Sequence, residues 1–129
     1  ILTEGDLFLS AGTALKGFGR AAGIPAATFS SGGTLNNGHG YGGGFGLQTA
    51  AICAAGGYPT HTDNTESYNG TSWTEVNDLN TARNGSSTVG TNTAAIVASG
   101  YSGTVYLTVA ETWNGSAWTE VNELNTAKY

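Results

Sequence analysis

Two nearly identical stretches of sequence decide the fold. Residues 70–83 read GTSWTEVNDLNTAR, and residues 115–128 read GSAWTEVNELNTAK. Ten of the fourteen positions are identical, and Trp73 and Trp118 lie 45 residues apart. A period of this length indicates a supersecondary unit repeated in series, either a helical pair or a four-stranded sheet.

A more divergent copy precedes these two. Phe29 and Leu35 lie 44 residues before Trp73 and Leu79, and TAAI at 49–52 lies 44 residues before TAAI at 93–96. The period of 44–45 residues therefore predicts a repeat segment over residues 25–129, preceded by a separate segment over residues 1–24.

The composition selects the sheet over the helical pair. The chain of 129 residues contains 21 Gly, only 10% charged residues and few strong helix formers,. The net charge of −5, with four basic residues, argues against a nucleic-acid partner,. No apolar stretch approaches the length that membrane insertion by a helix requires. We expect an all-β chain.

Each copy divides into strands. Short apolar runs at 49–54 and 93–98 predict buried second strands,. Asn-Gly pairs at 69–70 and 114–115 predict tight hairpins that lead into last strands at 71–76 and 116–121,. Trp73 and Val76 would lie on opposite faces, so both faces carry a large apolar side chain, as expected of stacked sheets. The connectors 77–84 and 122–128 would be anchored by Leu79 and Leu124.

This pattern resembles the kelch-type and galactose-oxidase-like β-propeller repeat. Members of that family have glycines after the second strand, an aromatic residue in the third and a Trp in the fourth. The matching residues here are Gly56-Gly57, Tyr68 and Trp73 in one copy, and Gly100, Trp113 and Trp118 in the next. The resemblance implies about two four-stranded antiparallel blades plus a leading strand, forming part of a larger ring or assembly.

The amino-acid sequence of the repeat also resembles repeats in fibres and other structural proteins of tailed marine bacteriophages. Residues 3–9 (TEGDLFL) and 12–19 (GTALKGFG) resemble a hairpin common in phage tail-fibre chains. In physical terms this predicts two strands, 6–9 and 14–18, around a turn at 10–13. The resemblance implies a virion or extracellular location, with other virion proteins or copies of the chain itself as partners.

The end of the sequence falls where a further blade would begin. Because a propeller needs about four to eight blades to close, we expect the chain to be a piece of a longer protein or one of several copies in an assembly.

Some residues resemble sites of chemistry. Gly38–Gly43 (GHGYGG) match the G-x-G-x-x-G pattern with Asp63 downstream, but the repeat places them in a connector before a strand, whereas a dinucleotide site needs a helix there,. His39 and His61 lack paired metal-ligand spacing. Cys53 lies in an apolar run and is expected to be a buried small residue. The copper site of the galactose-oxidase branch cannot be placed on this chain. We expect no catalytic residue, cofactor or metal.

Carboxylates recur in register with the repeat. The pairs are Glu66 and Glu111, Glu75 and Glu120, and Asp78 and Glu123. A catalytic group need occur only once, so recurrence favours a structural role. We expect Glu66 and Glu111 to cap backbone amides of a neighbouring loop.

Three tyrosines, Tyr58, Tyr101 and Tyr106, are candidates for contact with a ligand or partner. They could stack on a host-surface glycan or pack between blades, and Tyr106 with Leu107 could extend the strand that reaches Thr112. Recognition usually lies on loops of a rigid scaffold, here 38–44, 58–65 and 102–109. The sequence favours a non-enzymatic structural or adhesion module of a phage particle, such as a tail fibre. The alternative is a secreted carbohydrate-binding propeller or a fragment of a carbohydrate-active enzyme.

Overall fold

The computed structural model describes residues 7–9, 15–17 and 32–128. These fall into two units, 1–31 and 32–129, and each is treated by itself. In the first unit, β1 (Leu7–Leu9) pairs antiparallel with β2 (Leu15–Gly17), as predicted for the N-terminal hairpin. The predicted turn and the leading strand around Phe29 lie outside the described residues.

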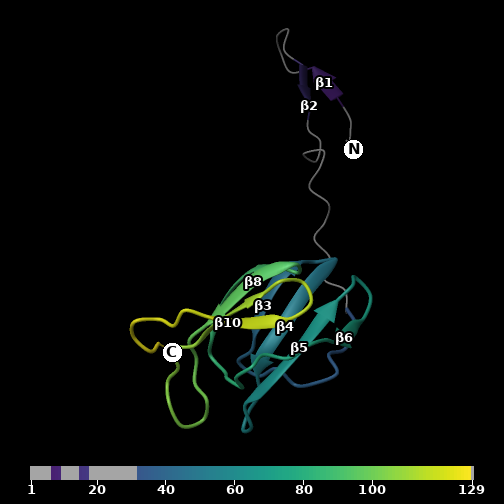
Figure 1. Ribbon diagram of the computed structural model, residues 1–129. Helices are drawn as coiled ribbons and strands as arrows, with labels where there is room; N and C mark the ends of the chain where they lie inside the picture. Colours follow the sequence, from purple (N-terminus) through teal and green to yellow (C-terminus); the bar gives the residue numbers. More distant parts are fainter. Residues whose placement is uncertain (1–6, 10–14, 18–31, 129) are drawn as a thin grey trace. The chain divides into compact units, whose positions relative to one another are not determined.

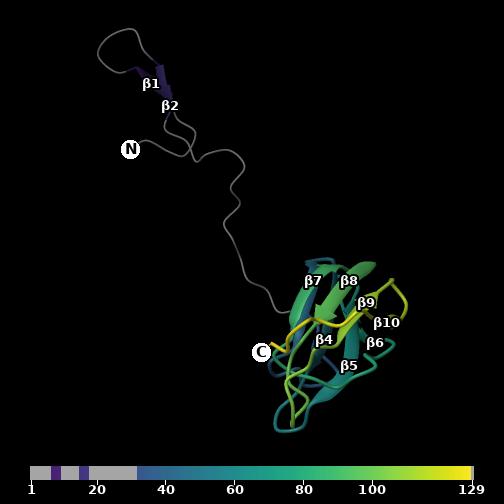
Figure 2. The same cartoon turned by 60° about the vertical axis from the view of Figure 1, so that its left-hand side comes forward.

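The second unit consists of two four-stranded antiparallel sheets, which lie face to face (Figures 1 and 2). The described residues are therefore all-β, as predicted. The first sheet has the order β3-β4-β5-β6 and the second β10-β9-β8-β7. Their strands are β3 (Gly43–Leu47), β4 (Ala50–Gly56), β5 (Thr62–Tyr68), β6 (Trp73–Glu75), β7 (Ser87–Thr91), β8 (Ala94–Ala98), β9 (Ala110–Trp113) and β10 (Trp118–Val121).

The hairpin loops differ from the two-residue turns that the Asn-Gly pairs predict. Tyr68 pairs with Trp73, so residues 69–72 form a four-residue loop. The side chain of Asn69 accepts hydrogen bonds from the amides of Thr71 and Ser72, and Asn114 does the same for the amides at 116 and 117. This Asx geometry uses positive φ only at the glycine, Gly70 in the first loop,. Each last strand consequently begins at its Trp.

A shared core holds the sheets together. Trp113 and Trp118 of the second sheet pack with Ile52 and Leu79 from the first sheet and its connector. The ring of Phe45 meets that of Trp118 edge-on at 6.2 Å, and the indole of Trp118 donates a hydrogen bond of 3.1 Å to Thr65 Oγ1. Such aromatic pairs add stability beyond the apolar area that they bury.

The first strands of the two sheets, β3 and β7, lie against each other at the interface. A Cβ at Gly43 would collide with the side chain of Thr88. Glycine is therefore required there for the close approach. This also explains why the bounds of β3 were not predicted: its GGFGL sequence has weak strand propensity,.

One predicted anchor is wrong. Leu79 is 3% exposed between the sheets, but its repeat partner Leu124 is 36% exposed. Leu79 is covered because a second sheet stacks on the first. In the described part of the chain no third sheet stacks on the second, so Leu124 stays open.

The repeat provides a matched test of the core. Trp118 is 6% exposed, whereas Trp73, at the same repeat position, is only half-buried. We expect Trp118→Ala to lower the free energy of unfolding by about 3–5 kcal/mol and Trp73→Ala to lower it by clearly less, measured by urea denaturation. Equal losses would contradict the stacked arrangement.

Candidate functional site

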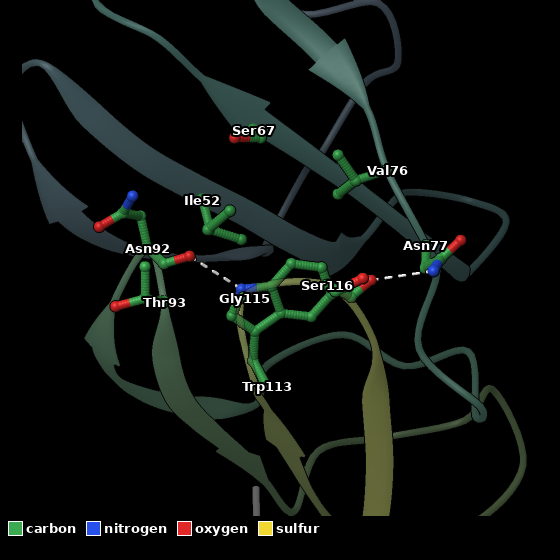
Figure 3. Close-up of a pocket in the computed structure, with 9 residues that line it drawn as sticks. All are labelled: Ile52, Ser67, Val76, Asn77, Asn92, Thr93, Trp113, Gly115 and Ser116. Atoms are coloured by element: carbon green, nitrogen blue, oxygen red, sulfur yellow. Dashed lines mark hydrogen bonds between the residues drawn. The ribbon is translucent and has the colours of Figure 1, made fainter.

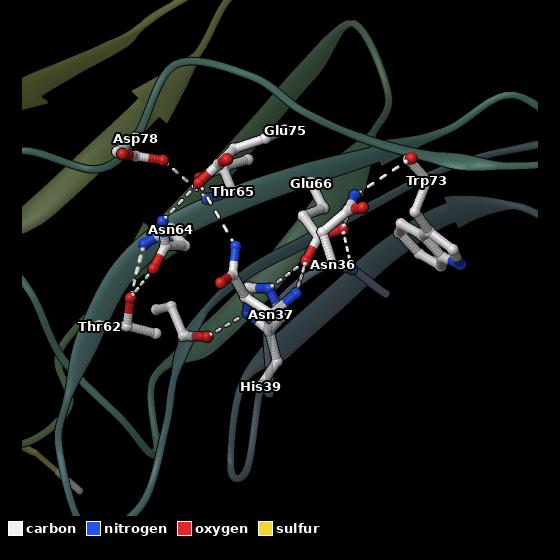
Figure 4. Close-up of polar contacts among 11 residues, drawn as sticks. Asn36, Asn37, His39, Thr62, Asn64, Thr65, Glu66, Trp73, Glu75 and Asp78 are labelled. Atoms are coloured by element: carbon white, nitrogen blue, oxygen red, sulfur yellow. Dashed lines mark hydrogen bonds and ion pairs between the residues drawn. The ribbon is translucent and has the colours of Figure 1, made fainter. Parts of the chain in front are cut away.

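A buried carboxylate lies at the centre of the polar contacts in the first sheet (Figure 4). Glu66, in β5, is fully buried. Asn36 donates to its Oε2 from both the backbone amide and the side-chain amide, each at 2.8 Å. The amide of Asn37 donates to Oε1 at 2.7 Å, and His39 Nε2 lies 3.2 Å from the same oxygen. The connector before the sheet thus holds the carboxylate in its third strand.

The second sheet repeats this arrangement with an arginine in place of the histidine. Asn80 donates to Glu111 Oε2 from its backbone and side-chain amides, again at 2.8 Å each. Arg83 donates to Glu111 Oε1 at 2.5 Å, and both side chains are fully buried. The guanidinium also donates to the carbonyl oxygens of Ser99 and Val109 at 3.2 and 2.9 Å. We call each set a carboxylate clamp: the third-strand glutamate with the Asn and basic residue of the preceding connector.

The clamps compensate a large desolvation cost. Burial raises the pKa of Glu66, but the hydrogen bonds from Asn36, Asn37 and His39 outweigh it and hold the pKa below its ordinary value,. For Arg83, burial lowers the pKa, opposed by Glu111. The guanidinium stays charged because Arg does not lose its proton in proteins. Buried charges of this kind persist only when paired and hydrogen-bonded.

The prediction that Glu66 and Glu111 cap backbone amides of a neighbouring loop is confirmed. The donors were not predicted, although the sequence holds a signal for them. Asn36 and Asn80 lie 44 residues apart, and so do His39 and Arg83. The second correspondence is hard to recognise because one copy has His39 where the next has Arg83.

The first clamp also positions a loop at one end of the sheets. With His39 held by Glu66 and by the carbonyl of Ala55, the chain turns through a bond from Gly42 N to His39 O. Tyr41 sits in this turn with φ of 59° and is 69% exposed. Its ring meets Tyr58 edge-on at 6.4 Å. Tyr41 was not singled out from the sequence, because nothing in its Gly-rich setting distinguishes it.

The loop after β4 meets the loop after β8. The ring of His61 lies 5.6 Å from that of Tyr101, which lies 5.3 Å from that of Tyr106. Tyr58 and Tyr106 are 78% and 59% exposed, and Tyr101 is half-buried, with its hydroxyl bonded to the carbonyl of Gly103. We call Tyr41, Tyr58, His61, Tyr101 and Tyr106 the aromatic loop surface. It contains all three tyrosines proposed as contact residues.

A cavity of about 300 Å³ opens at this surface. Tyr58 and His61 line it together with Asn37 and Asn64. Asn64 also donates to Glu75 at 2.8 Å, so its amide is fixed in place. Aromatic faces beside fixed amides are suited to a polyhydroxylated ligand, since rings stack on the apolar faces of sugars and amides bond their hydroxyls.

A second cavity, of about 400 Å³, lies between the sheets (Figure 3). The indole of Trp113 lies within it and donates to the carbonyl of Asn92 at 2.9 Å. Asn77 bridges the sheets by donating to the carbonyl of Ser116 at 2.9 Å. The apolar lining, Ile52, Val76 and Trp113, belongs to the shared core, so this cavity is a feature of the stacking.

The other residues that the sequence suggested as sites of chemistry lie in strands or in the segments that lead into them. Residues 38–42 lead into β3, which begins at Gly43, so the pattern lacks the helix that a dinucleotide cradle needs,. Asp63 lies in β5. Cys53 is half-buried; burial, then Glu66, raises its pKa to about 11, which keeps the thiol protonated and unreactive,. Among residues 7–9, 15–17 and 32–128, no group of three His, Cys, Asp or Glu side chains could hold a metal ion.

Two of the predicted loop boundaries need correction. Residues 43–44 and 62–65 belong to β3 and β5, because each pairs with β4. Tyr106 and Leu107 do not extend β9, which begins at Ala110. Tyr106 instead bridges to Tyr101, and this pairing closes the loop on itself.

Comparison with known proteins adds no family. The chain matches no family model, and no curated protein shows significant similarity to it. Within the described ranges, the structure contains no helix that is long and apolar enough to cross a lipid bilayer.

The depressed pKa of Glu66 predicts how stability depends on pH. A carboxyl with a folded-state pKa below its unfolded value contributes stability above the unfolded value, near 4.3 for Glu, and loses it as the pH falls through the folded value. We expect Glu66→Gln to lower the free energy of unfolding at pH 7 by roughly 1–3 kcal/mol. The deficit relative to wild type should shrink between pH 5 and pH 3 in urea titrations.

The matched control is Glu120→Gln, the same substitution at an exposed position. It should change stability much less at every pH, because exposed charges contribute little. A deficit for Glu66→Gln that does not change with pH would show that the carboxylate charge is not what the clamp uses.

Proposed function

We propose that this protein is a non-enzymatic structural and adhesion module of a bacteriophage particle. Its two sheets would be blades of a kelch-like β-propeller on a tail fibre or other surface appendage. The family resemblance of the repeat supports the blades, and the resemblance of residues 3–19 to a tail-fibre hairpin supports the particle.

The observation that carries the adhesive role is the aromatic loop surface. Its rings come from three loops at one end of a rigid pair of sheets, which is where recognition residues are usually placed. Tyr58 and Tyr41 form an edge-on pair that is largely open to solvent. The adjoining cavity carries amides from Asn37 and Asn64. A host-surface glycan matches this combination of apolar faces and hydrogen-bonding groups.

The same surface keeps a second candidate open, a secreted carbohydrate-binding propeller. The two functions share the ligand chemistry and differ in where the protein resides. Antibodies against the protein should label the tail or surface of intact phage particles. Labelling that is confined to free, secreted protein would favour the lectin and contradict the particle.

Binding itself is tested by point substitution. We expect the protein to bind bacterial surface polysaccharide saturably, and we expect Tyr58→Ala to weaken binding by about tenfold or more, since one stacked aromatic ring contributes on the order of 1–3 kcal/mol, as for stacking on bases. Calorimetry or a glycan array gives the readout.

The control is Val89→Ala, another exposed apolar side chain, which lies on β7 away from these loops. It should bind like wild type. Equal weakening by both substitutions, or no saturable binding to any polysaccharide of the array, would contradict the adhesive role.

A further inference from the structure

We propose that the outer face of the second sheet binds a third four-stranded sheet of the same repeat, and that Asn125 and Lys128 clamp the third-strand glutamate of that sheet. This inference rests on the stacked-repeat part of the proposed function, not on its ligand. Three observations support it: the position of the connector after the second sheet, the exposed apolar face beside that connector, and the fact that Glu66, the other third-strand glutamate, is already held by its own connector.

The connector after the second sheet is already in position. Leu79 N donates to Asp63 O at 3.0 Å, and Leu124 N donates to Thr108 O at 2.8 Å. Gly56 N donates to Arg83 O at 2.7 Å, and Gly100 N donates to Lys128 O at 3.2 Å. The chain from 124 to 128 therefore follows the second sheet in the way that the chain from 79 to 83 follows the first.

That connector carries the donors of a clamp without the acceptor. Asn125 and Lys128 stand 45 residues after Asn80 and Arg83. Asn80 and Arg83 hold Glu111 of the next sheet. Arg83 is fully buried in that contact, whereas Lys128 is exposed. An exposed amide and a cation in this geometry are complementary to a carboxylate.

The outer face of the second sheet, beside this connector, is apolar like the face that the first sheet buries in the shared core. Val89, Ile96 and Thr112 are cross-strand neighbours on the outer face. They correspond to Phe45, Ile52 and Ser67, the face of the first sheet on which Trp113 and Trp118 pack. Ile52 and Leu79 are 2% and 3% exposed.

The outer face lacks that cover. Val89, Val121 and Leu124 are 66%, 38% and 36% exposed. A further repeat would place an aromatic pair on them, continuing the interface already present. The repeats supply that pair at matching positions: Tyr68 with Trp73 at 5.0 Å, and Trp113 with Trp118 at 5.2 Å between ring centroids.

A second copy of this chain fits less well than a further repeat. The first sheet of a second copy carries Glu66, which Asn36, Asn37 and His39 of its own chain already hold. Residues 35–39 of that copy and residues 124–128 of this one would compete for one place. The open donors require a sheet whose glutamate is free.

The test appends a second copy of residues 84–128 directly after Lys128, which keeps the repeat spacing. We expect this extended chain to unfold in one cooperative transition with a higher urea midpoint than the parent, because repeat stability depends on nearest-neighbour interfaces. Acylation of the Lys128 amine should slow by roughly tenfold or more, because a clamped amine reacts only through local opening.

The parent chain with the same substitutions is the matched control. Asn125→Ala and Lys128→Met should leave the parent midpoint unchanged and should lower the midpoint of the extended chain. Substitution of the appended copy of Glu111 by Gln should remove the effect of Lys128→Met. A separate transition for the appended copy, with Lys128 as reactive as in the parent, would overturn the inference.

Sedimentation of the parent chain, which ends without the appended repeat, tests whether a second copy of the chain binds the outer face instead. A dimer that Leu124→Asp abolishes would place a second copy on the outer face and overturn the choice of a further repeat. A monomer at the same concentration supports it. These readouts involve no ligand. The stacking of a further repeat can therefore be contradicted while glycan binding is confirmed, and glycan binding can be contradicted while the stacking is confirmed.

Discussion

The structure depends on a carboxylate that is buried between a sheet and the connector preceding it. Glu111 is fully buried, and such a charge is tolerated only when donors surround it,. Asn80 and Arg83 provide those donors from the connector that follows the first sheet. The clamp therefore fixes how one sheet is placed relative to the next, in addition to satisfying a buried charge.

Stacking and loop placement follow from this constraint. With the connector fixed, the Trp113 and Trp118 rings meet Ile52 and Leu79 in the shared core. In the first sheet the same kind of clamp holds His39, and the turn after it presents Tyr41 beside Tyr58. The exposed aromatic side chains thus stand on loops whose bases are held by buried polar contacts.

Recurrence in the sequence predicted part of the fold, and other parts depend on contacts that only the folded chain makes. The capping role of Glu66 and Glu111 followed from recurrence in register, and the all-β class followed from the composition. The bounds of β3 were not predicted, because Gly43 serves the close approach to Thr88 of β7, which is a tertiary requirement. The hairpin loops were misjudged because the Asn69 side chain, not only the Asn-Gly backbone, sets the turn.

Only part of the candidate site could be predicted from the sequence, for a similar reason. Tyr58, Tyr101 and Tyr106 could be named as exposed-loop aromatics, but their grouping with Tyr41 and His61 depends on which loops the fold brings together. Leu124 was expected to anchor its connector as Leu79 does, yet burial at that position depends on a neighbouring sheet and not on the residue itself.

Amide hydrogen exchange of Asn80 and Asn125 tests the central claim most directly. The two residues occupy the same position of the repeat, but only the Asn80 amide faces a buried carboxylate in the described structure. We predict that the Asn80 amide exchanges as slowly as the strand amides of β8, and that the Asn125 amide exchanges quickly. Equally fast exchange at both positions would contradict the view that buried carboxylates hold the sheets in place.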